Sequence, residues 1–358
     1  MTWHILYRGS LSSCNYRCDY CPFAKTRNTR EELRADAVEL ERFVAWVERQ
    51  DRRIGVLFTP WGEALIRRHY QKAMLRLGDM PHVYRVAVQT NLSCDTAWLS
   101  AADRESVALW LTFHPGETER AAFVAKCCAL TRLGIRFSVG VVGLREHFDD
   151  IDALRAALPP AVYVWVNAFK RVPDYYQAAE VERIRRVDPY FDLNRRYHPS
   201  RGKACEAGHT SFTVDGTGTV RRCHFIAEPI GNIYDGADLG ARLEPRPCTN
   251  AVCGCHIGYV HRPELALYEL FGDGLLERIP ARWPIDEVTA AADRRARALL
   301  VHRSGEPDEG SEDLPGDATA PSVDSDHVGE VRTHLLVERD ERSAREVGAK
   351  VPIPKPAQ

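Results

Sequence analysis

Residues 14–21 read Cys14-Asn15-Tyr16-Arg17-Cys18-Asp19-Tyr20-Cys21, so that three cysteines follow one another with the spacing C-x3-C-x2-C. A structural zinc site is closed by four protein ligands, whereas an iron–sulfur cluster held by three cysteines keeps one iron open for a small molecule. Thiolates bind zinc and iron–sulfur clusters alike, and the spacing alone therefore leaves both metals open. The run predicts a metal centre, and an open iron would make that centre a catalytic site.

The composition around this run is that of a globular protein, with 358 residues of which 44% are hydrophobic. A net charge of −2 provides no overall positive field, so we expect no nucleic acid and no membrane surface as a partner. The sequence opens without signal-peptide features and contains no run of 18 apolar residues, which predicts a cytoplasmic protein. In that reducing compartment, eleven cysteines favour metal binding over disulfides.

Short apolar segments alternate with amphipathic segments over the first half of the chain. Strands are expected at residues 3–8, 54–59, 83–88, 107–113, 136–142 and 162–166. Helices are expected at residues 29–50, 117–133 and 148–158. This order predicts an α/β fold in which a parallel sheet forms a partial (β/α)6 barrel of the TIM type.

Polar residues follow the expected strands, where the active sites of such barrels lie. The cysteine run comes after the first strand. The later strands are followed or ended by Gly62-Glu63, Asn91, Thr112 with His114, Gly143 with Glu146, and Asn167. Each of these residues alone would be expected in an ordinary turn or cap, but together they predict one site along the ends of the strands.

A second group of cysteines lies in a region of turns and short strands that starts near residue 193. Cys205 and Cys223 flank a hairpin turn at Asp215-Gly216, and Cys248, Cys253 and Cys255 follow. Cys94, Cys127 and Cys128 fit no such spacing, and the last two are expected in a buried helix. A zinc ribbon is the structural alternative for the second group.

The chain is thus expected to have four parts. A barrel core spans residues 1–192, and a small cysteine-rich α+β domain spans residues 193–268. Helical stretches at 263–276 and 285–300 account for a C-terminal segment at 269–302. Residues 303–358 are rich in Gly, Ser, Pro, Asp and Glu and should be a largely disordered tail, with a short helix near 333–342.

The cysteine run, with Tyr20 before its last cysteine, resembles the signature of the radical S-adenosylmethionine (SAM) superfamily, and the resemblance covers roughly residues 3–270. It implies that Cys14, Cys18 and Cys21 hold a [4Fe-4S] cluster whose open iron binds SAM, with the backbone of Tyr20 near the adenine. Gly62 and Glu63 are similar to the Gly-Glu pair that receives the methionine ammonium. Trp61 and Ala64 depart from the commoner Gly and Pro at the ends of that motif.

The same resemblance implies further contacts with SAM. Val141, Gly143 and Glu146 look like the fifth-strand motif of the family near the adenine, although its first Gly is missing here. Thr112 or His114 would lie near the ribose, and Asn167 is a further candidate for binding the cofactor.

The second cysteine group resembles the Twitch and SPASM domains, which hold auxiliary [4Fe-4S] clusters. Five cysteines instead of the seven of SPASM imply a Twitch-like domain with a single second cluster. Cys205 and Cys223 would be ligands, and two of Cys248, Cys253 and Cys255 would complete the set; if only three cysteines bind, this cluster has a substrate-facing site. His224 is the candidate catalytic residue, as a proton acceptor between the clusters.

The resemblance therefore implies an enzyme that cleaves SAM reductively to a 5'-deoxyadenosyl radical, which takes hydrogen from a peptide or protein substrate in an oxidation or a crosslink. The electron would come from a low-potential donor of the flavodoxin or ferredoxin type. Arg8, Lys170 and Arg171 are candidates for binding an acidic substrate. Two alternatives stay open: a radical SAM dehydrogenase of a small sugar-like or natural-product intermediate, and a zinc-binding interaction protein without turnover.

Overall fold

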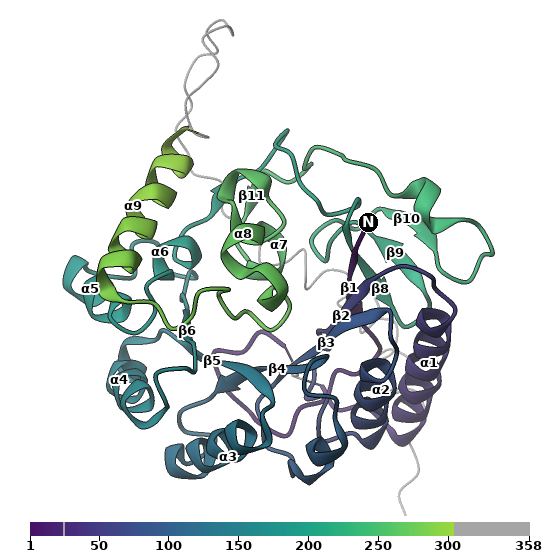
Figure 1. Ribbon diagram of the computed structural model, residues 1–358, viewed down its shortest axis with the longest axis horizontal. Coiled ribbons are helices and arrows are strands. Elements are labelled where there is room, and N and C mark those ends of the chain that lie inside the picture. Colours follow the sequence, from purple (N-terminus) through teal and green to yellow (C-terminus); the bar gives the residue numbers. More distant parts are fainter. Residues whose placement is uncertain (24–25, 304–358) are drawn as a thin grey trace, which may run out of the picture. The chain divides into compact units, whose positions relative to one another are not determined.

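The computed structural model of the chain describes residues 1–23 and 26–303. Its main element is a sheet whose strands follow the order β10-β9-β8-β1-β2-β3-β4-β5-β6 (Figure 1). The predicted tail and its short helix lie outside the described residues, apart from Arg303.

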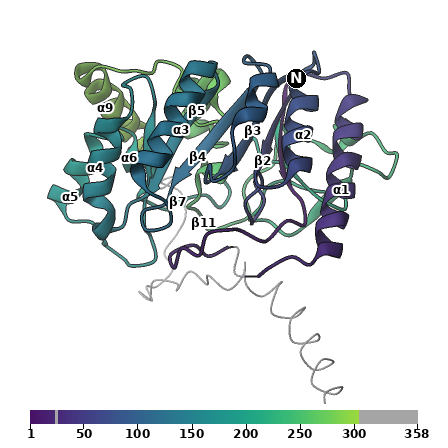
Figure 2. The ribbon, with the colours of Figure 1, turned by 90° about the horizontal axis from the view of Figure 1, so that it is seen from below.

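Six parallel strands form most of this sheet, and an α-helix follows each of them except β3, which is followed by the 3-10 helix η1 (Ala97–Ala101). Strands β1 to β6 pair in parallel, each with the next, as the alternating pattern predicts. Their bounds are Trp3–Arg8, Ile54–Phe58, Val83–Thr90, Val107–Phe113, Arg136–Val142 and Val164–Asn167. Helices α1 to α6 span Arg30–Glu48, Arg68–Gly78, Arg120–Leu133, Phe148–Ala157, Ala178–Arg185 and Phe191–Asn194. The predicted mixed α/β fold with a large parallel sheet is thus confirmed, and helices α1 to α4 cover its convex side (Figures 1 and 2).

Helix α1 has a clear start signal in the sequence. The side chain of Thr29 accepts a hydrogen bond from the Glu32 backbone amide, and the Glu32 carboxylate accepts one from the Thr29 amide. This capping box satisfies two amides that the helix itself leaves unpaired. The buried face of the helix, with Leu40, Phe43 and Val47, then packs on the sheet.

Successive side chains of each strand belong to two different apolar cores, because a strand points its side chains alternately to opposite faces. Trp3, Ile5 and Tyr7 of β1 pack in the core under the helices. Leu6 packs in the second core, on the concave face. The concave core is completed by the later part of the chain, including Ile257, Tyr259, Leu267, Leu270, Phe271, Leu275 and Leu276.

The inward-facing positions change character along the strands. Apolar residues such as Leu6, Leu57 and Ala87 contact the concave core. By the same alternation, the inward positions nearest the C-terminal ends of five of these strands are polar: Arg8, Thr59, Gln89, Thr112 and Asn167. Strand β5 has the apolar Val142 at this position. The strands therefore present a polar rim at the end where their connecting loops carry the candidate residues.

The cysteine-rich part is joined to strands β1 to β6 by a shared sheet. Strand β8 (Ser211–Asp215) pairs in parallel with β1, and β9 (Thr219–Arg221) returns antiparallel beside β8. The predicted hairpin is confirmed, since the Asp215 carbonyl accepts from the Gly218 amide at 2.9 Å and Gly218 has a φ of +84°. Strand β10 (Pro229–Asn232) follows β9. The domain boundary near residue 192 stays a prediction, and the sheet is continuous across it.

Short elements make up the rest of this part. Strands β7 (His198–Pro199) and β11 (Val252–Cys253) form a second, antiparallel pair, and α7 spans His256–Tyr259. The 3-10 helix η3 (Leu239–Arg242) also belongs to this part, whereas η1 (Ala97–Ala101) and η2 (Arg145–His147) lie between the strands of the first half of the chain.

The stretch predicted to be helical at residues 263–276 is helical in three short pieces and not in one helix. The segment is divided into η4 (Pro263–Leu265), α8 (Leu267–Phe271) and η5 (Gly272–Gly274). Ala266 and Gly272 have positive φ angles of 49° and 50°, which interrupt the helix so that its apolar side chains can fill the concave face. Helix α9 (Glu287–Arg303) agrees with the predicted helix at 285–300. Within the described part of the chain, no helix has the length and apolar character needed to cross a membrane.

Candidate functional site

The loop after β1 carries the first three cysteines, none of which forms a disulfide with another described residue. Burial raises the pKa of Cys18 to about 12, and the negative charges of Glu117 and Cys21 add to this effect. Burial also raises the pKa of Cys14, again with a contribution from Cys21. The three thiols therefore lie within electrostatic range of one another, in a largely desolvated place.

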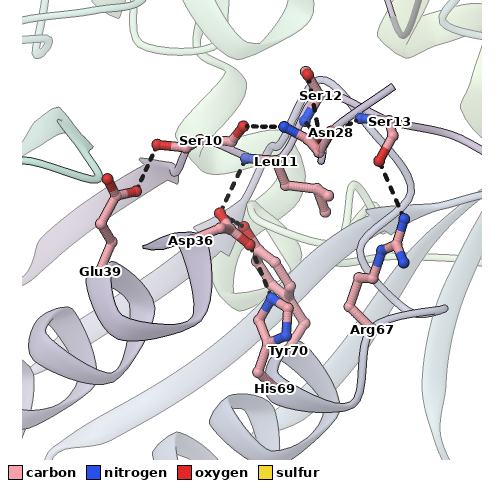
Figure 3. Close-up of polar contacts among 10 residues, drawn as sticks. All are labelled: Ser10, Leu11, Ser12, Ser13, Asn28, Asp36, Glu39, Arg67, His69 and Tyr70. Carbon is pink, nitrogen blue, oxygen red and sulfur yellow. Dashed lines mark hydrogen bonds and ion pairs between the residues drawn. The ribbon is translucent and has the colours of Figure 1, made fainter. Parts of the chain in front are cut away.

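The residues that precede Cys14 are held by helix α1 and the segment before α2 (Figure 3). The side-chain oxygen of Asn28 accepts from the backbone amides of both Ser12 and Ser13, each at 2.8 Å. The Leu11 amide donates to the Asp36 carboxylate at 3.0 Å, and Arg67 donates to the Ser13 hydroxyl at 3.1 Å.

Asp36 is the buried centre of this network. It is fully buried, and its carboxylate also accepts from the Tyr70 hydroxyl at 3.2 Å and lies 2.8 Å from Nε2 of His69. Sequence reasoning missed Asn28, Asp36 and Arg67. For Asp36 a signal exists, since it falls on the apolar stripe of α1 with Leu40 and Phe43.

The other half of the cysteine loop contacts loops of the later strands. Nδ1 of His114, after β4, lies 3.4 Å from the Cys18 sulfur and 2.9 Å from the Tyr20 hydroxyl. The Arg17 amide donates to Glu117 at 2.9 Å, and Arg171, after β6, donates to the Tyr20 carbonyl at 3.0 Å. Figure 2 shows this loop, in purple, running along the ends of the strands. His114 and Tyr20 are thus brought to the cysteines, as their places in the sequence suggest.

The Gly-Glu turn after β2 packs directly on the cysteine loop. The Gly62 amide donates to the Leu11 carbonyl at 3.3 Å, and the Glu63 amide donates to the Ser13 carbonyl at 3.1 Å. A Cβ atom on Gly62 would lie 2.1 Å from the Ser13 carbonyl oxygen. Only glycine fits this contact, which fixes the turn one residue away from Cys14.

The Glu63 carboxylate is buried beside the first cysteine. It accepts from the Thr90 hydroxyl at 2.6 Å and from the amides of Asn91 and Leu65 at 2.7 and 2.9 Å. Burial raises the pKa of Glu63, and these three donors oppose the rise. The side-chain amide of Asn91 lies 3.7 Å from the Cys14 sulfur, so Asn91 touches both groups.

The carboxylate of Glu63 has one position left for a ligand. A carboxylate offers about four lone-pair positions, of which three are used here. A ligand ammonium is a group that this remaining position can bind.

The other predicted cofactor contacts lie farther along the rim. Thr112 is half-buried on the inward face of β4. The side chain of Val141 is buried in the core under the helices, so a cofactor could contact its backbone only. The Gly143 amide donates to the Asn167 carbonyl at 2.8 Å, and the Asn167 side chain is exposed. Their roles toward SAM stay predictions.

The five later cysteines gather in one place. The pKa of Cys253 is raised by burial and then by Cys255, Cys223, Cys205 and Cys248, in that order. Burial raises the pKa of Cys223 to about 11, with Cys205 and Cys248 adding to it. Cys255 differs from the others, because it is exposed and its thiolate favours the charged forms of Arg8 and Lys170.

The donor sets fit iron–sulfur clusters. Among residues 1–23 and 26–303, no three Cys, His, Asp or Glu side chains lie close enough to share a single metal ion. A [4Fe-4S] cluster binds each thiolate through a different iron, so its ligands surround a larger group than one ion. Cys21 contributes to the raised pKa of both Cys14 and Cys18, and the four other later cysteines contribute to the raised pKa of Cys253. Each group thus brings together thiols, which are ligands of the soft type that such clusters require.

His224 follows β9 and contacts the end of β2. Its Nε2 atom is 3.0 Å from the Thr59 hydroxyl. Burial lowers the pKa of His224 well below its usual value, and the charges of Arg8 and Arg221 lower it further. The imidazole is therefore neutral at neutral pH, and the same surroundings disfavour its protonated form.

Lys170 lies at the end of β6. Its ammonium donates to the Asn194 carbonyl and the Gly254 carbonyl, both at 2.6 Å, and to the Asn194 side-chain oxygen at 3.2 Å. Burial lowers the pKa of Lys170 to about 8. This lysine connects the last barrel strand to the loop between Cys253 and Cys255.

Neither a protein-family model nor a curated protein matches the chain. Solved structures with a similar fold include native anSMEcpe with bound AdoMet, 14% identical with a TM-score of 0.42, in an alignment that covers 67% of this chain and 83% of that one. The structure of anSMEcpe with bound AdoMet and Kp18Cys peptide is 14% identical with a TM-score of 0.43, covering 68% and 83%. BtrN in complex with AdoMet and 2-DOIA is 15% identical with a TM-score of 0.31, covering 67% and 84%. With scores this low, a function has to be argued from the residues of this chain.

Proposed function

We propose that the chain is a radical SAM enzyme in which Cys14, Cys18 and Cys21 hold a [4Fe-4S] cluster with one open iron. The observation that carries this proposal is the packing of Gly62 on the Ser13 backbone, which leaves no room for a side chain. That contact brings a buried carboxylate, Glu63, to the neighbourhood of Cys14, with Asn91 touching both. A structural zinc site has no need of a carboxylate with a free lone pair next to its ligands.

The residues of the chain act mainly by positioning. When bound, the cluster and SAM supply a 5'-deoxyadenosyl radical that takes a hydrogen atom from the substrate. Glu63 binds the methionine ammonium through its remaining lone pair, since a charge-assisted hydrogen bond is stronger than a neutral one. Tyr20 and His114, which contact each other at 2.9 Å, form the wall of the site on the side of Cys18. Thr112, Gly143 and Asn167 line the rim toward the nucleoside.

We further propose that Cys205, Cys223, Cys248 and Cys253 hold a second cluster. Cys253 is coupled electrostatically to the other three, and Cys223 is coupled to Cys205 and Cys248. Cys255 also acts on Cys253, but it is exposed and its thiolate favours the charged forms of Arg8 and Lys170, so this proposal leaves it outside the ligand set. His224, next to Cys223 and in contact with the Thr59 hydroxyl, is in this proposal the acceptor of the proton that the substrate releases between the clusters.

The substrate is a peptide or protein side chain in this proposal, oxidised or crosslinked after hydrogen abstraction, with the electron supplied by a low-potential flavodoxin or ferredoxin. A dehydrogenase of a small sugar-like or natural-product intermediate uses the same machinery. Both reactions remove hydrogen from the substrate, and the second cluster provides a place for the electron that the substrate radical loses.

The test is reductive cleavage of SAM by anaerobically reconstituted protein. We expect about eight irons and eight sulfides per chain, and slow release of 5'-deoxyadenosine on addition of SAM and dithionite. Cys18→Ala should abolish this release, whereas Cys223→Ala should retain part of it and bind about four fewer irons. Cys128→Ala is the matched control, because Cys128 lies in helix α3 away from both groups, and it should behave as the unmodified protein.

Two outcomes would overturn the proposal. A colourless protein that binds zinc and releases no 5'-deoxyadenosine would favour a zinc-binding interaction protein. Undiminished cleavage in the Cys18 variant would show that the first cluster is not held by this loop.

A further inference from the structure

Arg8 is a half-buried cation at the end of β1 that has no carboxylate counter-ion among residues 1–23 and 26–303. Its Nε–H donates to the Thr59 carbonyl at 2.8 Å, and its guanidinium carbon lies 5.6 Å from the centre of the Trp61 ring. These two contacts fix the plane and the direction of the side chain. Within the described ranges, no carboxylate forms an ion pair with it.

The two terminal nitrogens of Arg8 donate no hydrogen bond to the described residues. The bond to Thr59 occupies Nε only, and no acceptor among the described residues takes a hydrogen bond from the two terminal NH2 groups. The residue is half-buried by area, so these groups are desolvated but reachable. Burial lowers the pKa of Arg8 to about 10, and the guanidinium still keeps its charge at neutral pH. A desolvated charge without a partner is costly, which points to an anionic partner that is not part of the protein.

The neighbouring cations differ from Arg8 in this respect. Lys170 uses its three N–H groups on three protein oxygens. Arg171 is exposed and holds the Tyr20 carbonyl. Of Arg8, Lys170 and Arg171, it is therefore Arg8 that has a planar pair of N–H donors available on the inward face of the sheet.

The position of Arg8 lies between the two proposed clusters. Trp61, over which it stacks, precedes the Gly62-Glu63 turn. Thr59, to which it donates, also contacts His224, the residue after Cys223. The thiolate of Cys255 is the acidic group whose charge favours protonated Arg8. A ligand bound to the free guanidinium edge would therefore lie beside both cysteine groups.

We infer that the substrate carries a carboxylate, which the terminal nitrogens of Arg8 bind as a bidentate pair. A carboxylate matches the guanidinium fork and brings the single negative charge that one unpaired arginine balances. A phosphate group, with nearly two charges, would leave part of its charge uncompensated here, since Lys170 is already saturated. The inference rests on the proposed function, because it names the substrate class of that site.

The test is the fluorescence of Trp61, taken as the difference between the unmodified protein and its Trp61→Phe variant. Sodium acetate is titrated at constant ionic strength, with acetamide as the neutral probe of the same shape. We expect a saturable change with acetate and none with acetamide. Arg8→Gln should weaken acetate binding by about tenfold or more, and Arg8→Lys should weaken it less, because lysine keeps the charge without the fork.

Arg53→Gln is the matched control. Arg53 lies just before β2, at the opposite end of the same pair of strands, and its ion pair with Asp273 is exposed. Its replacement should leave acetate binding unchanged. Equal responses to acetate and acetamide, or an Arg8→Gln protein with undiminished acetate binding, would overturn the inference. If Arg8→Gln does not fold, the acetate and acetamide comparison and the Arg8→Lys protein decide by themselves.

Two further probes distinguish the sources of the carboxylate. A short peptide with a central aspartate, compared with its asparagine counterpart, represents a peptide substrate, and succinate represents a small acid. Tighter binding of either acid than of its neutral counterpart supports the inference and identifies the source. None of these titrations requires SAM or a reductant, so a failure here is separate from a failure of the protein to release 5'-deoxyadenosine.

Discussion

Replacing Asp36 with alanine should destabilise the protein and displace the cysteine loop, although Asp36 touches no cysteine. Its carboxylate accepts from the Leu11 amide, which leads into that loop, and from the Tyr70 hydroxyl, and it contacts His69 (Figure 3). Asp36→Ala leaves all three groups without their acceptor. Leu11 and Tyr70 are buried and cannot turn to water, whereas His69 is partly exposed and can.

The magnitude follows from these burials. Each buried donor left unpaired costs about 1–3 kcal/mol, so two of them give a loss of about 4 kcal/mol in the free energy of unfolding. The matched control is Tyr70→Phe, which removes one hydrogen bond at the same carboxylate but leaves the Leu11 contact in place. It should cost about 1 kcal/mol. A domain of ordinary stability, about 5–15 kcal/mol, would still fold with either change.

Urea denaturation measures the stability of both variants, and release of 5'-deoxyadenosine measures the position of the loop. A displacement of reacting groups by about 1 Å costs up to ~100-fold in rate. We therefore expect a fall of that order for Asp36→Ala and a rate within about twofold of the unmodified protein for Tyr70→Phe. If both variants lose the same stability and the same rate, the Leu11 contact does not hold the loop and the reasoning is refuted.

Two more predictions concern the turn after β2 and the concave face. Gly62→Ala should reduce SAM cleavage strongly because its Cβ would lie 2.1 Å from the Ser13 carbonyl oxygen. Gly236→Ala, where a Cβ meets nothing within 4 Å and only the φ of +75° strains the backbone, should not reduce cleavage; equal rates in the two variants would contradict the contact. For His261, burial lowers the pKa to about 3, so below its unfolded pKa of about 6.5 the unfolded chain binds a proton that the folded chain does not. Unfolding free energy should therefore fall by about 2 kcal/mol between pH 6.5 and 5 through this residue, and His261→Gln should lose that part of the pH dependence in urea titrations at both pH values. An unchanged pH dependence in the variant would assign the acid sensitivity to other groups.

The sequence could predict the strands and the place of the cysteine run because both depend on local patterns. Alternation of apolar segments gives β1 to β6 within a few residues, and the hairpin at Asp215 follows from its turn residues. Once the strands are parallel, the loops at their C-terminal ends have to lie together. The contacts of Cys18 with His114 and of Cys14 with Asn91 agree with that rule.

The support of the site could not be predicted in the same way. Asn28 holds two amides of the cysteine loop, and Lys126 donates to the carbonyls of Leu92, Ser93 and Cys94 in the loop after β3. Such bonds join residues that are far apart in the chain, and no pattern of residue spacing in the sequence predicts them. The broken segment at 263–276 fails for a related reason, since its helical pattern is overridden by packing against the concave face.

The pairing of β1 with β8 bears on how the two cysteine groups could work together. The ladder runs in register from His4 opposite Ser211 to Arg8 opposite Asp215, so the strand that leads to Cys14 lies beside the strand whose hairpin leads to Cys223. A ladder of backbone hydrogen bonds is stiffer than a contact between two separate domains, which usually move relative to each other. The separation of the two groups is therefore set by the sheet itself, and Arg8, the last residue of that ladder, stands where a substrate would have to reach both.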